Sequence, residues 1–160
     1  MRTTADETRD HLMGTEFDWL LADRRGHVAV CQTAGFGDVP LHILDRGLDF
    51  ARMLEARLDE LATNLPVTGV HKWSWSRIAK DPLSRALAAR GFYVFGWDHS
   101  AEAYRRELRP TAPATISDLM RRATDTASVI PTIDACFARS RRLRLPPHLP
   151  CYRLGGEASG

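Results

Sequence analysis

The stretch Phe17–Pro40, FDWLLADRRGHVAVCQTAGFGDVP, decides the fold of this chain. Two runs of strand-forming residues, Phe17–Ala22 and His27–Thr33, flank the polar turn Asp23-Arg24-Arg25-Gly26. Asp opens a turn by accepting a hydrogen bond from the backbone two residues on, and Gly takes the positive φ that closes it. The pattern predicts a β-hairpin with a bulge at Gly26. Because an isolated hairpin is at best marginally stable, the rest of the chain must cover its apolar face.

Two helices are predicted after this hairpin. Ala34–Pro40 is typical of a tight loop rather than a strand, since it places two glycines around an aromatic residue and ends in proline. From about Leu41 to Leu65 the apolar residues recur at helical steps, with Asp45 as a candidate N-cap and Pro66 as the terminator. The core face of this helix contains Phe50, Ala51, Leu54, Leu58 and Leu61.

The second helix has a signal at each end. Asp81-Pro82 supplies an N-cap and a first helical position, and Gly91 lies just past the end. Leu83 and Leu87 lie one turn apart and are predicted to face the core. Ser76–Lys80 is predicted to form a separate helical turn ahead of that cap.

The remaining apolar runs indicate strands. Phe92–Trp97 is apolar on both alternating faces, which predicts a central strand covered on two sides, and Ala103–Leu108 predicts a strand paired with it. Val67–Trp73 is a candidate short strand. Thr132–Arg139 and Arg141–Leu145 indicate a last hairpin or a pair of short strands.

The predicted fold is therefore α+β, with a largely antiparallel sheet opened by the hairpin and two main helices packed on it. A chain of 160 residues is long enough to bury a core, and we assign residues 16–152 to a single domain. Residues 1–15 are predicted to be a flexible N-terminal arm and residues 153–160 a disordered tail.

Charge and cysteine content favour a cytoplasmic protein without nucleic acid or membrane as its partner. The formal net charge of +2 is too small to argue for nucleic acid. The first fourteen residues carry acids throughout and are unlike a signal peptide, and no apolar run approaches the ~20 residues needed to span a bilayer. The three cysteines form no CxxC pair, which favours reduced thiols.

No catalytic, cofactor or metal site is predicted. The sequence contains no GxSxG, HExxH or CxxC motif, and Gly35-Phe36-Gly37 lacks the residues that complete a phosphate-binding loop. Asp98-His99 is the only adjacent pair of metal-ligand types at a strand end, and we interpret it as a capping Asp beside an exposed His. The alternative is a small-molecule-binding or enzymatic domain, with a pocket where Asp98, His99 and Asp38 converge.

Two groups of residues are candidates for partner binding. Trp73 and Trp75 share a face if the chain there is extended, so the pair is either core or an interface anchor, and we favour core. Arg139, Arg141 and Arg142 belong to a basic cluster, which is either the solvated face of a strand or a dock for phosphate or an acidic partner; we favour the solvated face. Residues 101–160 hold 10 Arg against 6 acids, which leaves the acidic surplus in residues 1–100.

Three segments together resemble a group of small bacterial cytosolic proteins. They are FDWLLADRRGHVAVCQTAGFGDVP, RGFYVFGWDHSAEAYRRELRPTAPAT and DACFARSRRLRL. The group has an opening hairpin with the pattern W-[LF]-A-x-D-x-x-G-H-V-A-x-F-x-T-x-G-x-G-x-x-P and a strand with the pattern G-[LF]-Y-x-[FY]-x-W-D. The residues that match are Trp19, Asp23, Gly26, His27, Gly35, Gly37, Pro40, Tyr93, Trp97 and Asp98. Cys31 replaces the group's usual aromatic, and Gly96 stands where Asp is common, which weakens any Asp-x-Asp metal site.

Proteins of this kind are often encoded beside polymorphic or type VI secreted toxins and are taken to be their immunity partners. The resemblance implies that this chain is an immunity protein that binds a cognate toxin and covers its active site. It assigns no catalytic residue. The partner-binding candidates are Phe36, Asp38, Trp73, Trp75, Asp98, His99, Arg139, Arg141 and Arg142. A structural or regulatory adaptor without a toxin is a further alternative.

Overall fold

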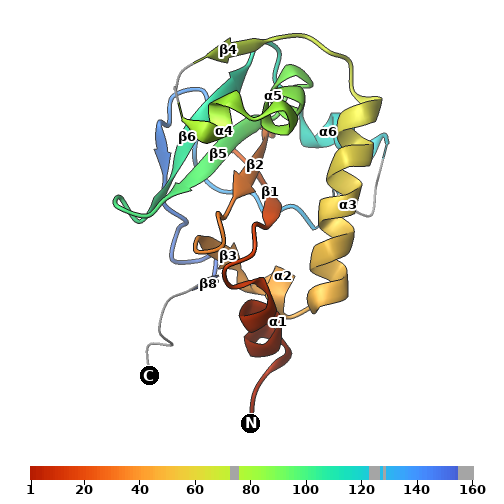
Figure 1. The fold of residues 1–160 in the computed structure, drawn as a ribbon. Helices are drawn as coiled ribbons and strands as arrows, with labels where there is room; N and C mark the ends of the chain where they lie inside the picture. The colour runs from red at the N-terminus through yellow and green to blue at the C-terminus, as the bar shows by residue number, and fades with distance from the viewer. Residues whose placement is uncertain (73–75, 123–126, 128, 155–160) are drawn as a thin grey trace.

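The computed structural model describes residues 1–72, 76–122, 127 and 129–154, and it has the predicted α+β fold (Figure 1). The main sheet has the strand order β1-β2-β5-β6-β4, with β7 pairing to the same edge of β6 as β4. Only the β2–β5 pair is parallel among the pairs of this sheet in the described part of the chain. The strands are β1 (Asp18–Ala22), β2 (Val28–Gln32), β4 (Val70–Lys72), β5 (Tyr93–Asp98), β6 (Ala103–Pro110) and β7 (Arg142–Leu143).

The opening hairpin is confirmed. Strands β1 and β2 pair antiparallel, with Leu20 opposite Val30. The carbonyl of Asp23 accepts a hydrogen bond from the Gly26 amide at 2.8 Å, and the Asp23 amide donates to the His27 carbonyl at 3.0 Å. Gly26 has a φ of 77°, the left-handed conformation that a bulge at this position requires.

The helix predicted over Leu41–Leu65 is split in two. The short α2 (Leu41–Leu44) is followed by α3 (Leu48–Asn64), and Gly47, with a φ of 88°, lies between them. Asp45 is the C-cap of α2, so its predicted role as an N-cap is wrong. The predicted end is confirmed, because α3 stops before Pro66.

Helix α5 (Pro82–Ala89) has its predicted cap, since the Asp81 side chain accepts a hydrogen bond from the Ser84 amide at 2.8 Å. Its buried face consists of Ser84, Leu87 and Ala88, whereas Leu83 is exposed, contrary to the prediction. The separate turn ahead of it is α4 (Arg77–Lys80), capped by Ser76.

The sheet separates two clusters of buried side chains. Leu87 and Ala88 of α5 pack with Val94 and Leu108 on one face. On the other face, α1, α2 and the C-terminal segments pack over Trp19, Tyr93 and other aromatic side chains. Helix α3 contacts β1 and contributes Leu54 to one cluster and Leu58 to the other, so it lies along the β1 edge of the sheet (Figure 1).

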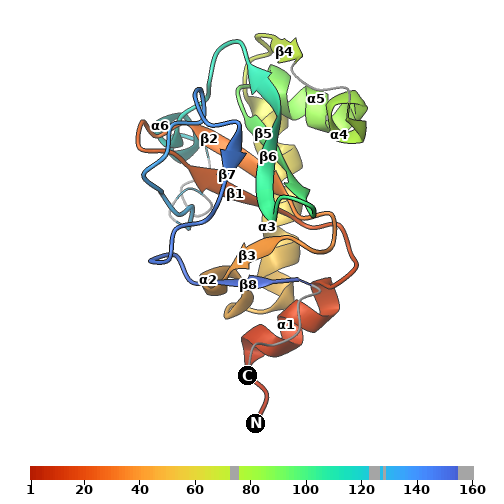
Figure 2. The same cartoon turned by 90° about the vertical axis from the view of Figure 1, so that its left-hand side faces the viewer.

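The two ends of the chain are more ordered than predicted. Residues 1–15 contain helix α1 (Thr4–Leu12), which starts with a capping box between Thr3 and Asp6 and buries Ala5, Thr8 and Leu12. Residue 153, the predicted start of the tail, belongs to β8 (Cys151–Arg153), and Leu154 is buried. Strand β8 pairs with β3 (Asp38–Pro40) below the main sheet (Figure 2), so the loop predicted over residues 34–40 ends in a strand. The rest of the predicted tail lies outside the described residues.

Of the two alternatives predicted for the C-terminal third, the hairpin is wrong, and of the pair of short strands only the second, β7, is present in the described residues. Thr132 makes an isolated bridge to Ala22, and β7 pairs with β6 instead of with residues 132–139. Before it lies the short helix α6 (Ile116–Met120). None of the helices within the described ranges is long and apolar enough to cross a membrane.

Candidate interaction surface

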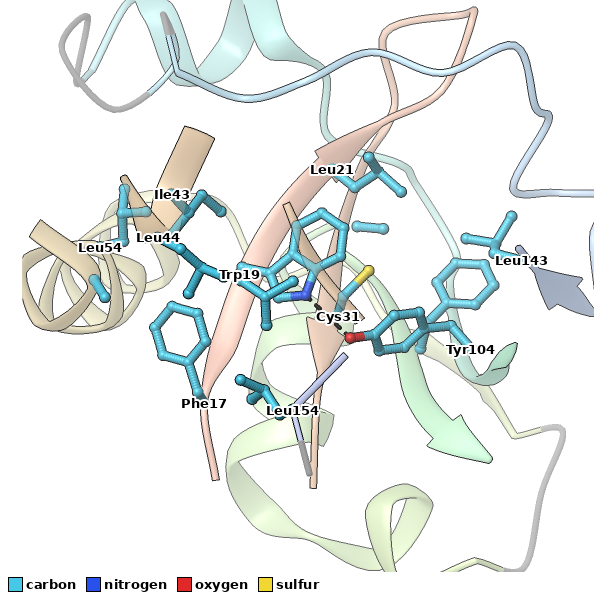
Figure 3. Packing of buried hydrophobic residues seen from close by; sticks show 14 of the residues in the cluster. Phe17, Trp19, Leu21, Cys31, Ile43, Leu44, Leu54, Tyr104, Leu143 and Leu154 are labelled. Atoms are coloured by element: carbon cyan, nitrogen blue, oxygen red, sulfur yellow. Dashed lines mark hydrogen bonds between the residues drawn. The ribbon is translucent and has the colours of Figure 1, made fainter. Parts of the chain in front are cut away.

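Aromatic side chains at the end of β5 and the start of β6 pack beneath a surface that several segments form. Trp97 and Tyr104 pack edge to face with ring centroids 5.1 Å apart. The Trp19 indole Nε1 donates to the Tyr104 hydroxyl at 3.2 Å (Figure 3), and that hydroxyl donates to the Asp38 carbonyl at 2.5 Å. Burial raises the pKa of Tyr104 well above its ordinary value, so the hydroxyl stays protonated and keeps its role as donor. These bonds fix β3 against the main sheet.

The loop between β2 and β3 presents Phe36. The amides of Phe36 and Gly37 both donate to the Thr33 carbonyl, at 3.0 and 2.9 Å. A Cβ on Gly37 would lie 2.7 Å from the Tyr104 hydroxyl, so only glycine fits against the aromatic side chains below. The Phe36 ring is 46% exposed and packs edge to face on His99, with centroids 6.0 Å apart. Two predicted partner-binding residues are thereby in contact.

Arg153 connects three segments at this surface. Its guanidinium donates to Asp38 at 3.0 Å and to Glu102 at 2.8 Å, and it lies 5.1 Å from the centroid of the Trp97 ring. The hydrogen bond from Arg153 neutralises the charge of Asp38, another predicted partner-binding residue. Beneath it, the Trp97 Nε1 atom is buried and has no hydrogen-bond partner among the described residues.

Asp98 caps the turn between β5 and β6. Its Oδ1 atom accepts from the Ser100 hydroxyl at 2.7 Å and from the amides of Ser100 and Ala101, while Oδ2 lies 3.6 Å from Arg105. The hydrogen bond from the Ser100 hydroxyl, followed by that from the Ala101 amide, lowers the pKa of Asp98. His99 is exposed beside it. This is the interpretation made from the sequence, a capping Asp followed by an exposed His.

A strip of exposed arginines in and around β7 leads away from the Asp98 turn along β6. Arg139, Arg141 and Arg142 are exposed, and Arg142 lies opposite Arg105 in the register of β6 and β7. Arg144 donates to the Ala101 carbonyl at 3.3 Å, which ties the strip to the Asp98 turn. Arg105 is itself paired with Glu107 at 3.0 Å and with Asp98 at 3.6 Å, so its charge is compensated within the protein.

The structure therefore brings Phe36, Asp38, Asp98 and His99 together, with Arg142 on β7 opposite Arg105, whereas Arg139 and Arg141 precede β7 and lie farther from the Asp98 turn. We call this group, with Glu102 and Arg153, the interaction surface. Trp73 and Trp75 lie outside the described residues. The sequence did not single out Arg153 or Glu102. The alternation in Cys151-Tyr152-Arg153-Leu154 was the available signal for β8, but nothing local indicated which strand it pairs with.

The described residues hold no group of three or more His, Cys, Asp or Glu side chains arranged to bind a metal ion. Cys31 and Cys136 are buried free thiols, and burial raises the pKa of Cys31 well above its ordinary value. Comparison with known proteins gives no match to a family model, to a curated protein or to a solved structure.

Proposed function

We propose that this protein is an immunity protein, which binds a secreted bacterial toxin of the polymorphic or type VI class and neutralises it in the cytoplasm by covering the toxin's active site. The class of partner comes from the resemblance of the three segments described above. The proposal rests on the interaction surface, where hydrogen bonds, ion pairs and ring contacts within the protein hold aromatic and charged side chains in place.

Such a surface is suited to tight binding because its side chains are already ordered. Phe36 is fixed by the Thr33 turn and His99, and Arg153 is fixed by two carboxylates. Ordering a long side chain on binding costs about 0.5–1.5 kcal/mol, and a preformed surface avoids that cost. Aromatic residues and arginine also dominate the residues that contribute most to binding energy in protein complexes.

The charges of the surface favour a partner with acidic groups at the border of the contact. Asp38 and Glu102 are paired with Arg153, and Asp98 is paired with Arg105. Arg139 and Arg142, in contrast, have no carboxylate partner within the described part of the chain. An acidic patch on the toxin would complement this strip.

Co-expression with the product of the gene that neighbours this one tests the proposal. The wild-type protein should restore growth and co-purify with the toxin. The double change Phe36→Ala with His99→Ala should weaken the complex about ten-fold or more, since it removes the central ring contact of the surface. The control is Val67→Ala, which alters a residue that is 68% exposed at the opposite end of β6. If the wild-type protein neither restores growth nor forms a complex, the proposed function is wrong.

A further inference from the structure

Strand β7 leaves one of its edges without a partner strand. It pairs with β6 on one side (Figure 2), and no strand in the described part of the chain pairs with its other side. The Arg106 amide donates to the Arg141 carbonyl at 2.8 Å, so these two residues form a hydrogen-bonded pair. Because hydrogen-bonded and non-hydrogen-bonded pairs alternate along antiparallel strands, Leu143 also bonds to β6, whereas the amide and carbonyl of Arg142 point away from it.

The side chains of β7 and the residue after it alternate between charged and apolar. Arg142 and Arg144 are exposed and lie on one face of this segment, whereas Leu143 between them is buried in the core. Arg144 donates to the Ala101 carbonyl at 3.3 Å, which holds this side chain near the turn between β5 and β6. Neither arginine forms an ion pair with a carboxylate of the described residues.

These charges determine which kind of chain can pair with the free edge. An edge strand offers backbone donors and acceptors to any extended segment, and charged side chains on the edge exclude unsuitable ones. A second copy of this protein would bring its own arginines against Arg142 and Arg144, and like charges opposite each other are destabilising. A segment with carboxylates opposite the two arginines and an apolar residue beside Leu143 has the complementary pattern.

We propose that the free edge of β7 binds an extended acidic segment of the toxin as an added strand. The amide and carbonyl of Arg142 bond to the backbone of that segment, and Arg142 and Arg144 pair with its carboxylates. The toxin as partner rests on the proposed function, whereas the alternation of acidic and apolar residues in the segment follows from β7 itself. The added strand adjoins the interaction surface, since Arg144 bonds to Ala101 in the turn that Asp98 caps.

A blocked peptide of alternating glutamate and valine is the probe for this edge. It is titrated into the isotope-labelled full-length protein and followed by NMR at constant ionic strength. We expect saturable shifts at Arg142, Leu143 and Arg144, and slower hydrogen exchange of the Arg142 amide, because that amide gains a hydrogen bond. A matched peptide of alternating lysine and valine should cause neither change. Absence of saturable shifts at β7, equal shifts with the lysine peptide, or pairing of β7 between two copies of the protein would overturn the inference.

Two variants separate the backbone of Arg142 from its charge. Arg142→Gln keeps the outward amide and should weaken binding of the glutamate peptide several-fold, whereas Arg142→Pro also removes the amide and should weaken it about five-fold or more beyond that. Proline is tolerated at a sheet edge where the N–H faces solvent, so the pairing with β6 is retained. Arg85→Gln, which alters an exposed arginine on α5, is the matched control and should bind as the wild type does. Equal affinities of the two Arg142 variants would overturn the added-strand geometry, and the exchange measurement on the wild type does not depend on how well either variant folds.

The same variants distinguish this inference from the proposed function. A toxin complex that is as tight with Arg142→Pro as with the wild type would overturn the added strand and leave the immunity function standing. Binding of the glutamate peptide at β7 by a protein that forms no toxin complex would refute the immunity function and support β7 as a site for acidic segments.

Discussion

Replacing Asp18 by asparagine should stabilise the protein at neutral and alkaline pH. The Asp18 carboxyl lies at the start of β1, where Gln32 donates a hydrogen bond to it at 3.5 Å and its own amide lies 3.4 Å from Glu55. Burial, followed by the charge of Glu55, raises the pKa of Asp18 from 3.8 to about 7. The folded protein therefore holds a proton on Asp18 that the unfolded chain has already lost.

The sign of the effect follows from this difference in proton binding. Between about pH 4 and pH 7 the folded state binds more protons than the unfolded state, so the free energy of unfolding falls as the pH rises through that range. Three pKa units correspond to about 4 kcal/mol. Because the carboxyl keeps some contact with solvent, we expect Asp18→Asn to recover about 1–3 kcal/mol at about pH 8. For a chain of this length that is a rise in Tm of about 2–10 °C.

Urea denaturation of the wild type and the variant at about pH 8 and pH 4 measures the effect. The gain should be present at the higher pH and should largely disappear at the lower, where the folded carboxyl is protonated and the unfolded one is close to half protonated. Asp134→Asn, which alters an exposed carboxylate that lies 3.6 Å from Arg24, is the control and should change stability by less than about 0.5 kcal/mol. An equal gain at both pH values, or none at pH 8, would refute the reasoning.

Two further changes test the packing that supports the interaction surface. Tyr104→Phe should lower the free energy of unfolding by about 1–3 kcal/mol, because it leaves the Trp19 indole N–H and the Asp38 carbonyl without their partner. Urea denaturation measures this cost, and a change below about 0.5 kcal/mol would show that water replaces the hydroxyl. Asp81→Ala should cost about 1 kcal/mol, since it removes the cap from the Ser84 amide. Asp81→Asn, which keeps a capping oxygen, should retain most of the stability, and equal losses in the two variants would contradict the capping role.

The sequence predicted correctly the helices and strands whose ends carry turn-forming or helix-capping residues. The Asp23–Gly26 turn fixed the register of the opening hairpin, and Asp81, Pro82 and Gly91 marked helix α5. Helix α1 was missed because its buried residues are Ala5, Thr8 and Leu12, of which only one is a large apolar side chain.

The pairings that assemble the interaction surface join residues far apart in the sequence. Asp38 and Arg153 are separated by 115 positions, and no local pattern states that β3 and β8 are partners. The same is true of β7, which pairs with β6, whereas the sequence suggested a hairpin or a pair of short strands over residues 132–139 and 141–145. Phe36, Asp38, Asp98 and His99 could be nominated from their loops. Their convergence depends on the order of strands in space.

The long separation in sequence between β3 and its partner strand β8 has a consequence for how the protein is made. While the chain is being synthesised, the β1–β2 hairpin can form early, since its contacts are local. Strand β3 must wait until residue 153 has left the ribosome, and only then can Arg153 join Asp38, Glu102 and the Trp97 ring. The interaction surface is thus completed only after residue 153 has been synthesised, so a nascent chain cannot engage a partner through it before that point.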